Sequence, residues 1–407
     1  MKKINSIICA AGLVLSLGLF ASCNQDKDES WKSIPSKEIT TESGNATLTI
    51  NEVAAENASA TLKATSLTAG TLTLTGAVPG FQTVAVPVTL TKVSDAEFSF
   101  EGGCNLGQPK PIELKSEMIV APFTITVNGT ATTDGKLTVT AATSVSEKAQ
   151  AGLAGTWNLL RKVTTTEEGR LENGPIFLKW TTNDDHNANV ANVASLAGVF
   201  GGGFVADALD QITLHEDGNI TAKYWDEPEM VGPETDEATN TATFGNSHKD
   251  EWLESEKDNE VFWYTLDNMI YVVPIIDTDD EEGETTEISM EELNKVIAQL
   301  KQYGVDTDAL TRELAVIMQR GFALKYETVD GALKVYADKE LCDPFAKALL
   351  PALPALDAML PSLIEGNETA AMIVGMVKGM LGIENLAELA DIWGATTEFE
   401  IALNLVK

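Results

Sequence analysis

The most regular feature of the chain is an alternation of apolar and polar residues between positions 40 and 148. The apolar members recur at every second position in six short runs: Leu48 and Ile50; Leu72 and Leu74; Val84, Val86, Val88 and Leu90; Phe98 and Phe100; Phe123, Ile125 and Val127; Leu137 and Val139. Successive side chains of a strand point to opposite faces of a sheet, so this period predicts antiparallel strands with one buried face. Residues 40–148 are therefore expected to form a Thr- and Val-rich β-sandwich or half-barrel.

Turn signals divide these runs. The dipeptides Pro79-Gly80, Asn128-Gly129 and Asp134-Gly135 are typical of tight turns and predict three strand connections. Pro87 lies on the polar side of its run and has no amide hydrogen to donate, which predicts an edge strand.

A second block, residues 152–407, contains strand-like segments of a different composition. They are Gly155–Arg161, 211–215 and 220–225 around Asp217-Gly218, 261–264 and 270–273 around Asp267-Asn268, 323–326 and 333–336 around Asp330-Gly331, and 397–403. About eight strands are enough for a small antiparallel barrel, which is the fold predicted here.

Three apolar segments with helical spacing interrupt these strands, near 188–208, 289–320 and 341–393. The first carries Val190, Val193, Leu196 and Phe200 and is expected to break at Gly201-Gly202-Gly203, either as a lid over the barrel or as a plug with a tight turn. The second begins with a capping box at Ser289 and Glu292. The chain as a whole is predicted to be mainly β with helical insertions.

The amino terminus has the features of an export signal. Lys2 and Lys3 precede an apolar run over residues 7–20, and the small residues Ala21 and Ser22 follow it. This run is too short to span a bilayer well, so residues 1–22 are predicted to be a cleaved signal peptide.

Phe20-Ala21-Ser22-Cys23 resembles the bacterial lipobox. The resemblance implies that Cys23 becomes the first residue of the mature chain and carries fatty acyl groups such as palmitate. One chain anchors a protein only marginally, whereas two or three anchor it stably. A membrane partner is therefore expected, through the lipid on Cys23.

The segment 23–39 is expected to be a flexible tether. Within it, Lys27, Asp28 and Glu29 resemble the signal that directs lipoproteins of the Bacteroidetes to the outer face of the outer membrane, which predicts a cell-surface protein. The alternative is that these residues are only a solvated part of the tether.

Charge restricts the partners. The chain has 28 basic and 61 acidic residues and a net charge of −33, and loss of the signal removes two lysines and no acid, giving −35. Such a surface repels phosphate groups, so nucleic acid and anionic lipid are not expected as partners.

Candidate chemistry is sparse. The three histidines, His186, His215 and His248, form no metal-protease or zinc-finger spacing, and no nucleophile elbow or phosphate-binding glycine loop occurs. Asp184-Asp185-His186 beside Trp180 is either a metal site or a polar loop, and Asp277–Glu284 is either a calcium loop or a solvated acidic loop. No cofactor, no metal and no catalytic residue are predicted.

Cys104 and Cys342 are the cysteines left after Cys9 is removed with the signal and Cys23 is lipidated. They are expected to be buried thiols, with a disulfide as the alternative.

Tryptophan is distributed unevenly. Residues 40–148 contain none, whereas six of the seven tryptophans lie in the second block. Because large aromatic side chains line binding pockets and stack on sugar rings, the candidate ligand-binding residues are Trp157, Trp180, Trp225, Trp263 and Tyr264. The alternative is that these side chains fill the core.

Gly155-Thr156-Trp157 resembles the opening strand of lipocalins, whose tryptophan closes one end of the barrel. The chain has no clear counterpart of the late-strand arginine that packs on that tryptophan. With the lipobox and the Thr-rich β domain, the layout is similar to uncharacterised Bacteroidetes surface lipoproteins with calycin-like or lipocalin-like domains. The resemblance implies a lipid-anchored protein of the outer membrane and names no ligand.

Three functions follow for such a chain. The first is non-catalytic binding or adhesion, with an apolar molecule or a glycan as ligand. The second is a structural or accessory role without a small-molecule pocket. The third is a hydrolase that uses paired carboxylates, which would require two convergent buried acids.

Overall fold

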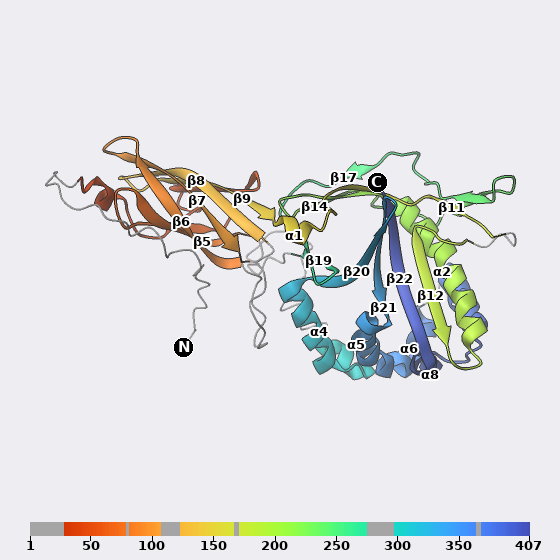
Figure 1. Ribbon diagram of the computed structural model, residues 1–407. Coiled ribbons are helices and arrows are strands. Elements are labelled where there is room, and N and C mark those ends of the chain that lie inside the picture. The colour runs from red at the N-terminus through yellow and green to blue at the C-terminus, as the bar shows by residue number, and fades with distance from the viewer. Residues whose placement is uncertain (1–27, 79–80, 107–122, 167–170, 275–296, 364–367) are drawn as a thin grey trace. The chain divides into compact units, whose positions relative to one another are not determined.

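A computed structural model of the chain describes residues 28–78, 81–106, 123–166, 171–274, 297–363 and 368–407. The protein is mainly β, with 43% strand and 28% helix, and it contains two curled half-barrel sheets, which confirms the predicted fold class. The chain divides into two compact units (Figure 1). Unit 1 comprises Met1–Ala154, His215–Asn219 and Lys257–Leu266; unit 2 comprises Gly155–Leu214, Ile220–Glu256 and Asp267–Lys407.

Unit 1 is built on a nine-stranded sheet with the order β1-β4-β5-β6-β7-β8-β9-β2-β3. All described neighbours are antiparallel except β2 and β9, which are parallel. The elements are η1 (Ser30–Ser33), β1 (Ile39–Thr40), β2 (Ala46–Ile50), β3 (Val53–Ala54), β4 (Ser59–Ala64), β5 (Ala69–Val78), β6 (Phe81–Lys92), β7 (Glu97–Leu106), β8 (Phe123–Thr132), β9 (Leu137–Val145), α1 (Glu147–Gln150) and β18 (Val261–Leu266).

The apolar residues of the alternating pattern form the core of unit 1. Every apolar residue of the six predicted runs lies in a strand and is buried, and β9 alternates buried and exposed residues along its whole length. Asp134-Gly135 forms a predicted turn, with Gly135 at a φ of +99°. Pro79-Gly80 lies outside the described residues.

Two local predictions for unit 1 are wrong. Asn128-Gly129 is not a turn but lies inside β8, where a Cβ on Gly129 would stand 2.6 Å from the Phe100 ring and 2.0 Å from the Thr138 carbonyl oxygen. That glycine therefore allows a close cross-strand approach. Pro87 lies in an inner strand, and the residue pairing between β6 and β7 starts one residue later, at Val88.

Unit 2 holds a sheet with the order β17-β14-β13-β10-β22-β21-β20-β19, with β12 also paired to β22, and a small sheet with the order β11-β16-β15. Its strands are β10 (Gly155–Leu159), β11 (Lys162–Thr164), β12 (Ile176–Thr182), β13 (Leu209–Leu214), β14 (Ile220–Tyr224), β15 (Glu234–Asp236), β16 (Thr241–Thr243), β17 (Leu253–Glu254), β19 (Met269–Pro274), β20 (Phe322–Val329), β21 (Ala332–Asp338) and β22 (Thr396–Val406). Hairpin turns form as predicted at Asp217-Gly218 and Asp330-Gly331.

The predicted helical insertions are present in unit 2. They are α2 (Asn187–Ala208), η2 (Lys301–Tyr303), α4 (Thr307–Arg320), α5 (Lys339–Leu349), η3 (Leu350–Ala352), α6 (Leu353–Leu363), α7 (Glu368–Leu381), η4 (Leu386–Glu388) and α8 (Leu389–Ala395). Figure 1 shows α2 alongside β12, and α4, α5, α6 and α8 gathered at one end of β20, β21, β22 and β12. The predicted capping box at Ser289 and Glu292 lies outside the described residues.

Helix α2 runs unbroken through the three glycines, so the predicted break at Gly201-Gly202-Gly203 is wrong. A Cβ on Gly203 would stand 1.8 Å from the Val231 carbonyl oxygen, and one on Gly202 would stand 3.2 Å from the Phe244 ring. The glycines thus serve close packing, not a hinge. Among the described helices, α2 is the one whose length and composition would suit a membrane span, and about a fifth of its apolar window, 22%, is buried inside the protein.

Candidate functional site

Three of the five candidate aromatic side chains belong to the core. Trp157 is 2% exposed, Trp263 0% and Tyr264 1%. The Trp263 indole donates to the His215 carbonyl oxygen at 2.9 Å, and the Tyr264 ring packs edge-on against Phe123. These side chains present no face to solvent.

Trp157 also has a cation on its ring. The Lys407 Nζ lies 4.8 Å from the ring centre, so a lysine at the chain terminus packs on the tryptophan of the opening strand of unit 2.

Trp180 is half-buried between β22 and α8. Its indole donates to the Thr396 hydroxyl at 2.9 Å, and its ring meets Phe399 edge-on, with ring centres 5.8 Å apart. Trp393 contacts the other side of this group, 5.1 Å from Phe399, and donates to Asp343. This cluster joins helices to the sheet.

Trp225 is the remaining candidate, and it lies in a partly exposed aromatic cluster of unit 2. The His248 ring stacks on Trp225 with centres 4.6 Å apart and planes 17° apart, and Trp252 meets His248 edge-on at 4.2 Å. The Arg161 guanidinium lies 5.2 Å from the centre of Trp252. We call Trp225, His248, Trp252 and Arg161 the aromatic cluster. All four side chains are partly accessible to solvent.

A buried carboxylate holds the cluster in place. Asp207, near the end of α2, is 0% exposed and accepts from the Glu229 amide at 2.6 Å, the Ser247 amide and the Ser247 hydroxyl. Burial acts to raise the pKa of Asp207, but these donors outweigh it and hold the pKa below its ordinary value. The ionised acid therefore fixes the two loops that carry Trp225 and His248 to the helix end.

Arg161 is held by backbone oxygens. Its guanidinium donates to the carbonyls of Leu209, at 2.9 Å, and Gly245, at 3.3 Å, and it lies 3.5 Å from an Asp210 carboxylate oxygen. Burial lowers the pKa of Arg161, and the Asp210 charge opposes that shift. The arginine thus stays in one orientation below Trp252.

The loop that carries His248 has an unusual backbone. Lys249 and Asp250 are consecutive non-glycine residues at positive φ, +55° and +63°. Two hydrogen bonds stabilise this backbone path. The Asn246 side-chain nitrogen donates to the Asp250 carboxylate at 2.6 Å, and the Asp250 backbone amide donates to the Asn246 side-chain oxygen at 3.1 Å.

The two ring nitrogens of His248 differ in their hydrogen bonding. Its Nε2 lies 3.2 Å from the Asp207 carbonyl oxygen, whereas its Nδ1 is buried and has no hydrogen-bond partner among the described residues. Buried ring nitrogens normally have a partner, so Nδ1 is an exception among the buried polar atoms of the described residues.

Sequence reasoning found Trp225 and missed the rest of the aromatic cluster. Trp252, His248 and Arg161 are spread over 92 positions and share no short motif. The one usable signal was the density of aromatic and polar residues between 224 and 252.

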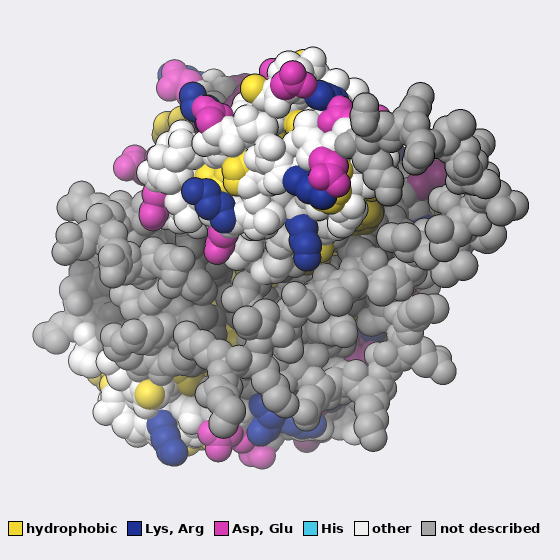
Figure 2. Space-filling view, turned by 90° about the vertical axis from the view of Figure 1, so that its left-hand side faces the viewer, with side chains coloured by type: hydrophobic (Ala, Val, Ile, Leu, Met, Phe, Trp, Pro, Cys, Tyr) yellow, Lys and Arg dark blue, Asp and Glu magenta, His cyan; other side chains and the backbone are white. Residues whose placement is uncertain are grey.

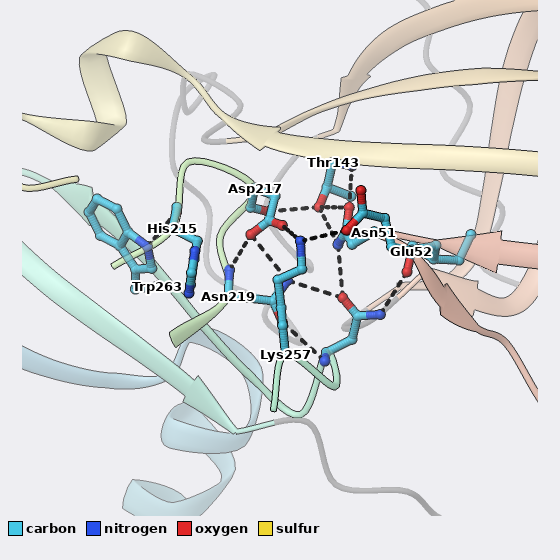
Figure 3. Close-up of polar contacts among 10 residues, drawn as sticks. Asn51, Glu52, Thr143, His215, Asp217, Asn219, Lys257 and Trp263 are labelled. Atoms are coloured by element: carbon cyan, nitrogen blue, oxygen red, sulfur yellow. Dashed lines mark hydrogen bonds and ion pairs between the residues drawn. The ribbon is translucent and has the colours of Figure 1, made fainter. Parts of the chain in front are cut away.

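Unit 1 contains a second polar group, a network of asparagines (Figure 3). Asn51 donates to Thr143 and to Asn259, each at 2.9 Å, and Asn219 donates to the same Asn259 oxygen at 3.1 Å. Asn259 in turn donates to the Ile50 carbonyl oxygen at 2.9 Å. Asn51, Thr143, Asn219 and Asn259 are all buried, and we call them the asparagine network.

A charged pair borders the asparagine network. Lys257 donates to Asp217 at 2.8 Å, and Asp217 also accepts from the Asn219 amide and side chain. The Thr143 hydroxyl donates to the Asp217 carbonyl oxygen at 2.7 Å (Figure 3). Because the side-chain groups bond one another, the network is a structural joint and not a ligand site. It ties segments 215–219 and 257–266, which the sequence placed in the second domain, into unit 1.

The remaining candidate residues are accounted for locally. Asp184 accepts from Thr182 at 2.7 Å and from the His186 amide at 3.0 Å, and its other oxygen lies 3.2 Å from His186 Nδ1, so this group shapes the start of α2. No group of three or more possible metal ligands occurs among the described residues. Asp277–Glu284 lies outside them.

Cys104 and Cys342 are of intermediate burial and do not form a disulfide. Desolvation by burial raises the pKa of Cys342, which keeps this thiol protonated at neutral pH.

Part of the predicted tether is bound to unit 1. Asp28 accepts from Lys92 at 2.9 Å and from the Ser30 amide at 2.9 Å, and Ser30 and Lys92 hold the Asp28 pKa far below its ordinary range. Glu29 pairs with Lys32. Cys23 and Lys27 lie outside the described residues.

Comparison with protein-family models, curated proteins and solved structures finds no match to this chain.

Proposed function

We propose that this chain is a lipid-anchored protein of the cell surface that binds a carbohydrate without transforming it, and that the aromatic cluster of unit 2 is the binding site. The observation that carries the proposal is the partly exposed stack of Trp225 on His248, next to Trp252. Sugar rings present C–H faces that pack on aromatic rings and hydroxyls that need polar partners.

Polar partners are present around the aromatic cluster. Asp210 and Asp250 carry carboxylates, and Asn246 carries an amide. Asp207 and Arg161 fix the aromatic rings before any ligand arrives, which lowers the entropy lost on binding.

A glycan fits these observations better than an apolar molecule. An apolar ligand would need a free apolar wall, and the candidates for it, Trp157 in unit 2 and Trp263 and Tyr264 in unit 1, are already packed in protein. Surface stacking needs only one free ring face or edge and tolerates an acidic surface, because most carbohydrate hydroxyls are neutral.

A structural role without a ligand is the second candidate, and the way α2 packs favours it. Gly202 and Gly203 bring α2 against Phe244 and Val231, as a helix that plugs the fold would require. A hydrolase is the third candidate. Asp207 is the only described carboxylate that is fully buried, and its role as an acceptor for loop amides leaves it no partner acid.

Binding is tested with the mature chain in affinity electrophoresis against a panel of neutral polysaccharides. We expect Trp225→Ala to lose retardation by any polysaccharide that retards the wild type. Tyr224→Ala is the matched control, because Tyr224 is the adjacent exposed aromatic residue and should keep retardation. Equal loss in both variants, or retardation unaffected by Trp225→Ala, would place binding elsewhere.

Anchoring is tested separately. Cys23→Ala should abolish metabolic fatty-acid labelling and release the chain from membranes, and labelling that persists would contradict the lipid site. Replacing Lys27, Asp28 and Glu29 together with alanine should reduce cleavage by external protease while lipidation continues. Lys92→Ala is the control, since it breaks the ion pair with Asp28 and leaves the signal intact.

A further inference from the structure

Unit 1 has two distinct ends along its strands. Strand β9 runs from Leu137 to Val145, and its partner β8 runs back from Phe123, opposite Val145, to Ala131, opposite Leu137. Nine strand residues span about 30 Å. We call the end at Leu137 the near end and the end at Val145 the far end.

The far end is where the chain passes into unit 2. The Val145 amide donates to the Glu216 carbonyl oxygen at 2.7 Å, and the Thr265 hydroxyl donates to the Ala149 carbonyl oxygen at 2.9 Å. Segments 215–219 and 257–266 are thus held beyond the end of β9. Each connects directly to residues of unit 2, as does Ala154.

The near end is where the N-terminal segment is bound. Lys92, the last residue of β6, pairs with Asp28 at 2.9 Å, and Ile34 is buried a few residues later. The Thr133 amide donates to the Ala96 carbonyl oxygen at 3.0 Å, which joins the β6–β7 and β8–β9 turns at this end.

Covalent geometry then limits how far the near end can lie from a lipid. Asp28 is the fifth residue after Cys23, and five steps along the chain span at most about 18 Å when fully extended. Resting on the proposed lipid anchor, we infer that the near end of unit 1, with its β6–β7 turn, lies at the bilayer surface, and that unit 1 is a spacer that holds the exits to unit 2 one strand length further out.

The charge at the near end suits this position. Three lysines and five acids occur there, Lys32, Lys92 and Lys136 with Asp28, Glu29, Asp95, Glu97 and Asp134, whereas the whole chain has 28 basic and 61 acidic residues. Figure 2 shows lysine and acidic side chains interspersed on the described surface of unit 1 seen from this side. A surface with this larger share of lysine meets less repulsion from anionic head groups than the rest of the chain does. Val93, at the turn, is 58% exposed and adds an apolar side chain to this face.

The inference is tested by energy transfer from single labels to the membrane. The full lipidated chain, with Cys104→Ser and Cys342→Ser, is labelled at Val93→Cys or at Glu216→Cys and reconstituted in phosphatidylethanolamine vesicles that carry a rhodamine lipid acceptor. Val93 marks the near end and Glu216 the far end, and both are exposed. We expect clearly higher transfer efficiency from the Val93 position.

A matched variant carries a flexible glycine-serine segment inserted between Cys23 and Lys27, which lengthens the greatest distance between the lipid and Asp28. The difference in transfer efficiency between the Val93 and Glu216 positions should then shrink. Chain that stays in solution, or carries no lipid, would overturn the proposed anchor. Lipidated, vesicle-bound chain with equal transfer from both labels, or higher transfer from the Glu216 position, would overturn the orientation alone.

Discussion

Replacing Asn259 tests whether the asparagine network holds unit 1 together. Its side chain makes three hydrogen bonds, from Asn51 and Asn219 to its oxygen and from its nitrogen to the Ile50 carbonyl oxygen. Each buried bond contributes about 1 kcal/mol net. Asn259 also has a φ of +67°, which alanine adopts less readily at a cost of about 1 kcal/mol. We therefore expect Asn259→Ala to destabilise unit 1 by about 4 kcal/mol.

Asn57→Ala is the matched control. Asn57 also lies in unit 1, has a φ of +49° and an exposed side chain, so its replacement should show the backbone effect alone. Hydrogen exchange read by mass spectrometry on peptides from 215–219 and 257–266 measures the local opening. The difference of about 3 kcal/mol predicts exchange more than about 100-fold faster than in the control. Equal exchange in the two variants would show that the side-chain hydrogen bonds of Asn259 do not stabilise unit 1.

Three further predictions concern stability. Burial raises the pKa of Asp217 but hydrogen bonds from Lys257 and Asn219 outweigh it and leave the pKa lowered, while the bond to Asp217 raises the pKa of Lys257. The advantage of the wild type over Lys257→Met in denaturant titration should therefore be constant from about pH 5 to 10. It should shrink as the pH falls below 3.8, the ordinary carboxyl value, or rises above 10.5, the ordinary lysine value. An advantage that does not change across either limit would contradict the pairing. Gly201→Ala should raise the thermal unfolding midpoint, since its Cβ meets only ordinary contacts and alanine stabilises a helix by up to about 1 kcal/mol, whereas Gly203→Ala should lower it because of the Val231 oxygen. Gly129→Ala should destabilise unit 1 by about 1–3 kcal/mol in the same titration, because its Cβ would meet Thr138 and Phe100. Thr126→Ala, on the exposed face of the same strand, should cost less than about 0.5 kcal/mol. Similar values for both variants would exclude a close cross-strand approach at Gly129.

Glycine and proline were the residues least readable from sequence. Asn128-Gly129 has the composition of a turn, and the run Gly201-Gly202-Gly203 that of a loop, yet both lie inside regular elements. The reason is the same in each case. What selects glycine there is a neighbouring atom from a distant segment, the Phe100 ring or the Val231 oxygen, and local sequence does not show which segment approaches.

The candidate site was readable in part. Trp225 was a candidate because of its residue type. Whether a tryptophan can bind a ligand depends on which of the six tryptophans in the second block stay in contact with solvent. Trp157 and Trp263 occur on equally strand-like segments and are buried. Exposure is set by packing between elements, so composition could not separate them.

The sequence by itself determined the strands of unit 1, their buried face, the hairpin turns with Asp-Gly and the helical segments, because a period of two, a helical period and positive-φ turn residues act within a few positions of the chain. Tertiary structure decided which strands belong together. Segments 215–219 and 257–266 follow the strand pattern of the second block but fold with the first, because Asn51, Asn219 and Asn259 satisfy one another's buried polar groups only there. Hydrogen bonds between residues more than 200 positions apart leave no periodic trace, and they fixed the boundary of unit 1.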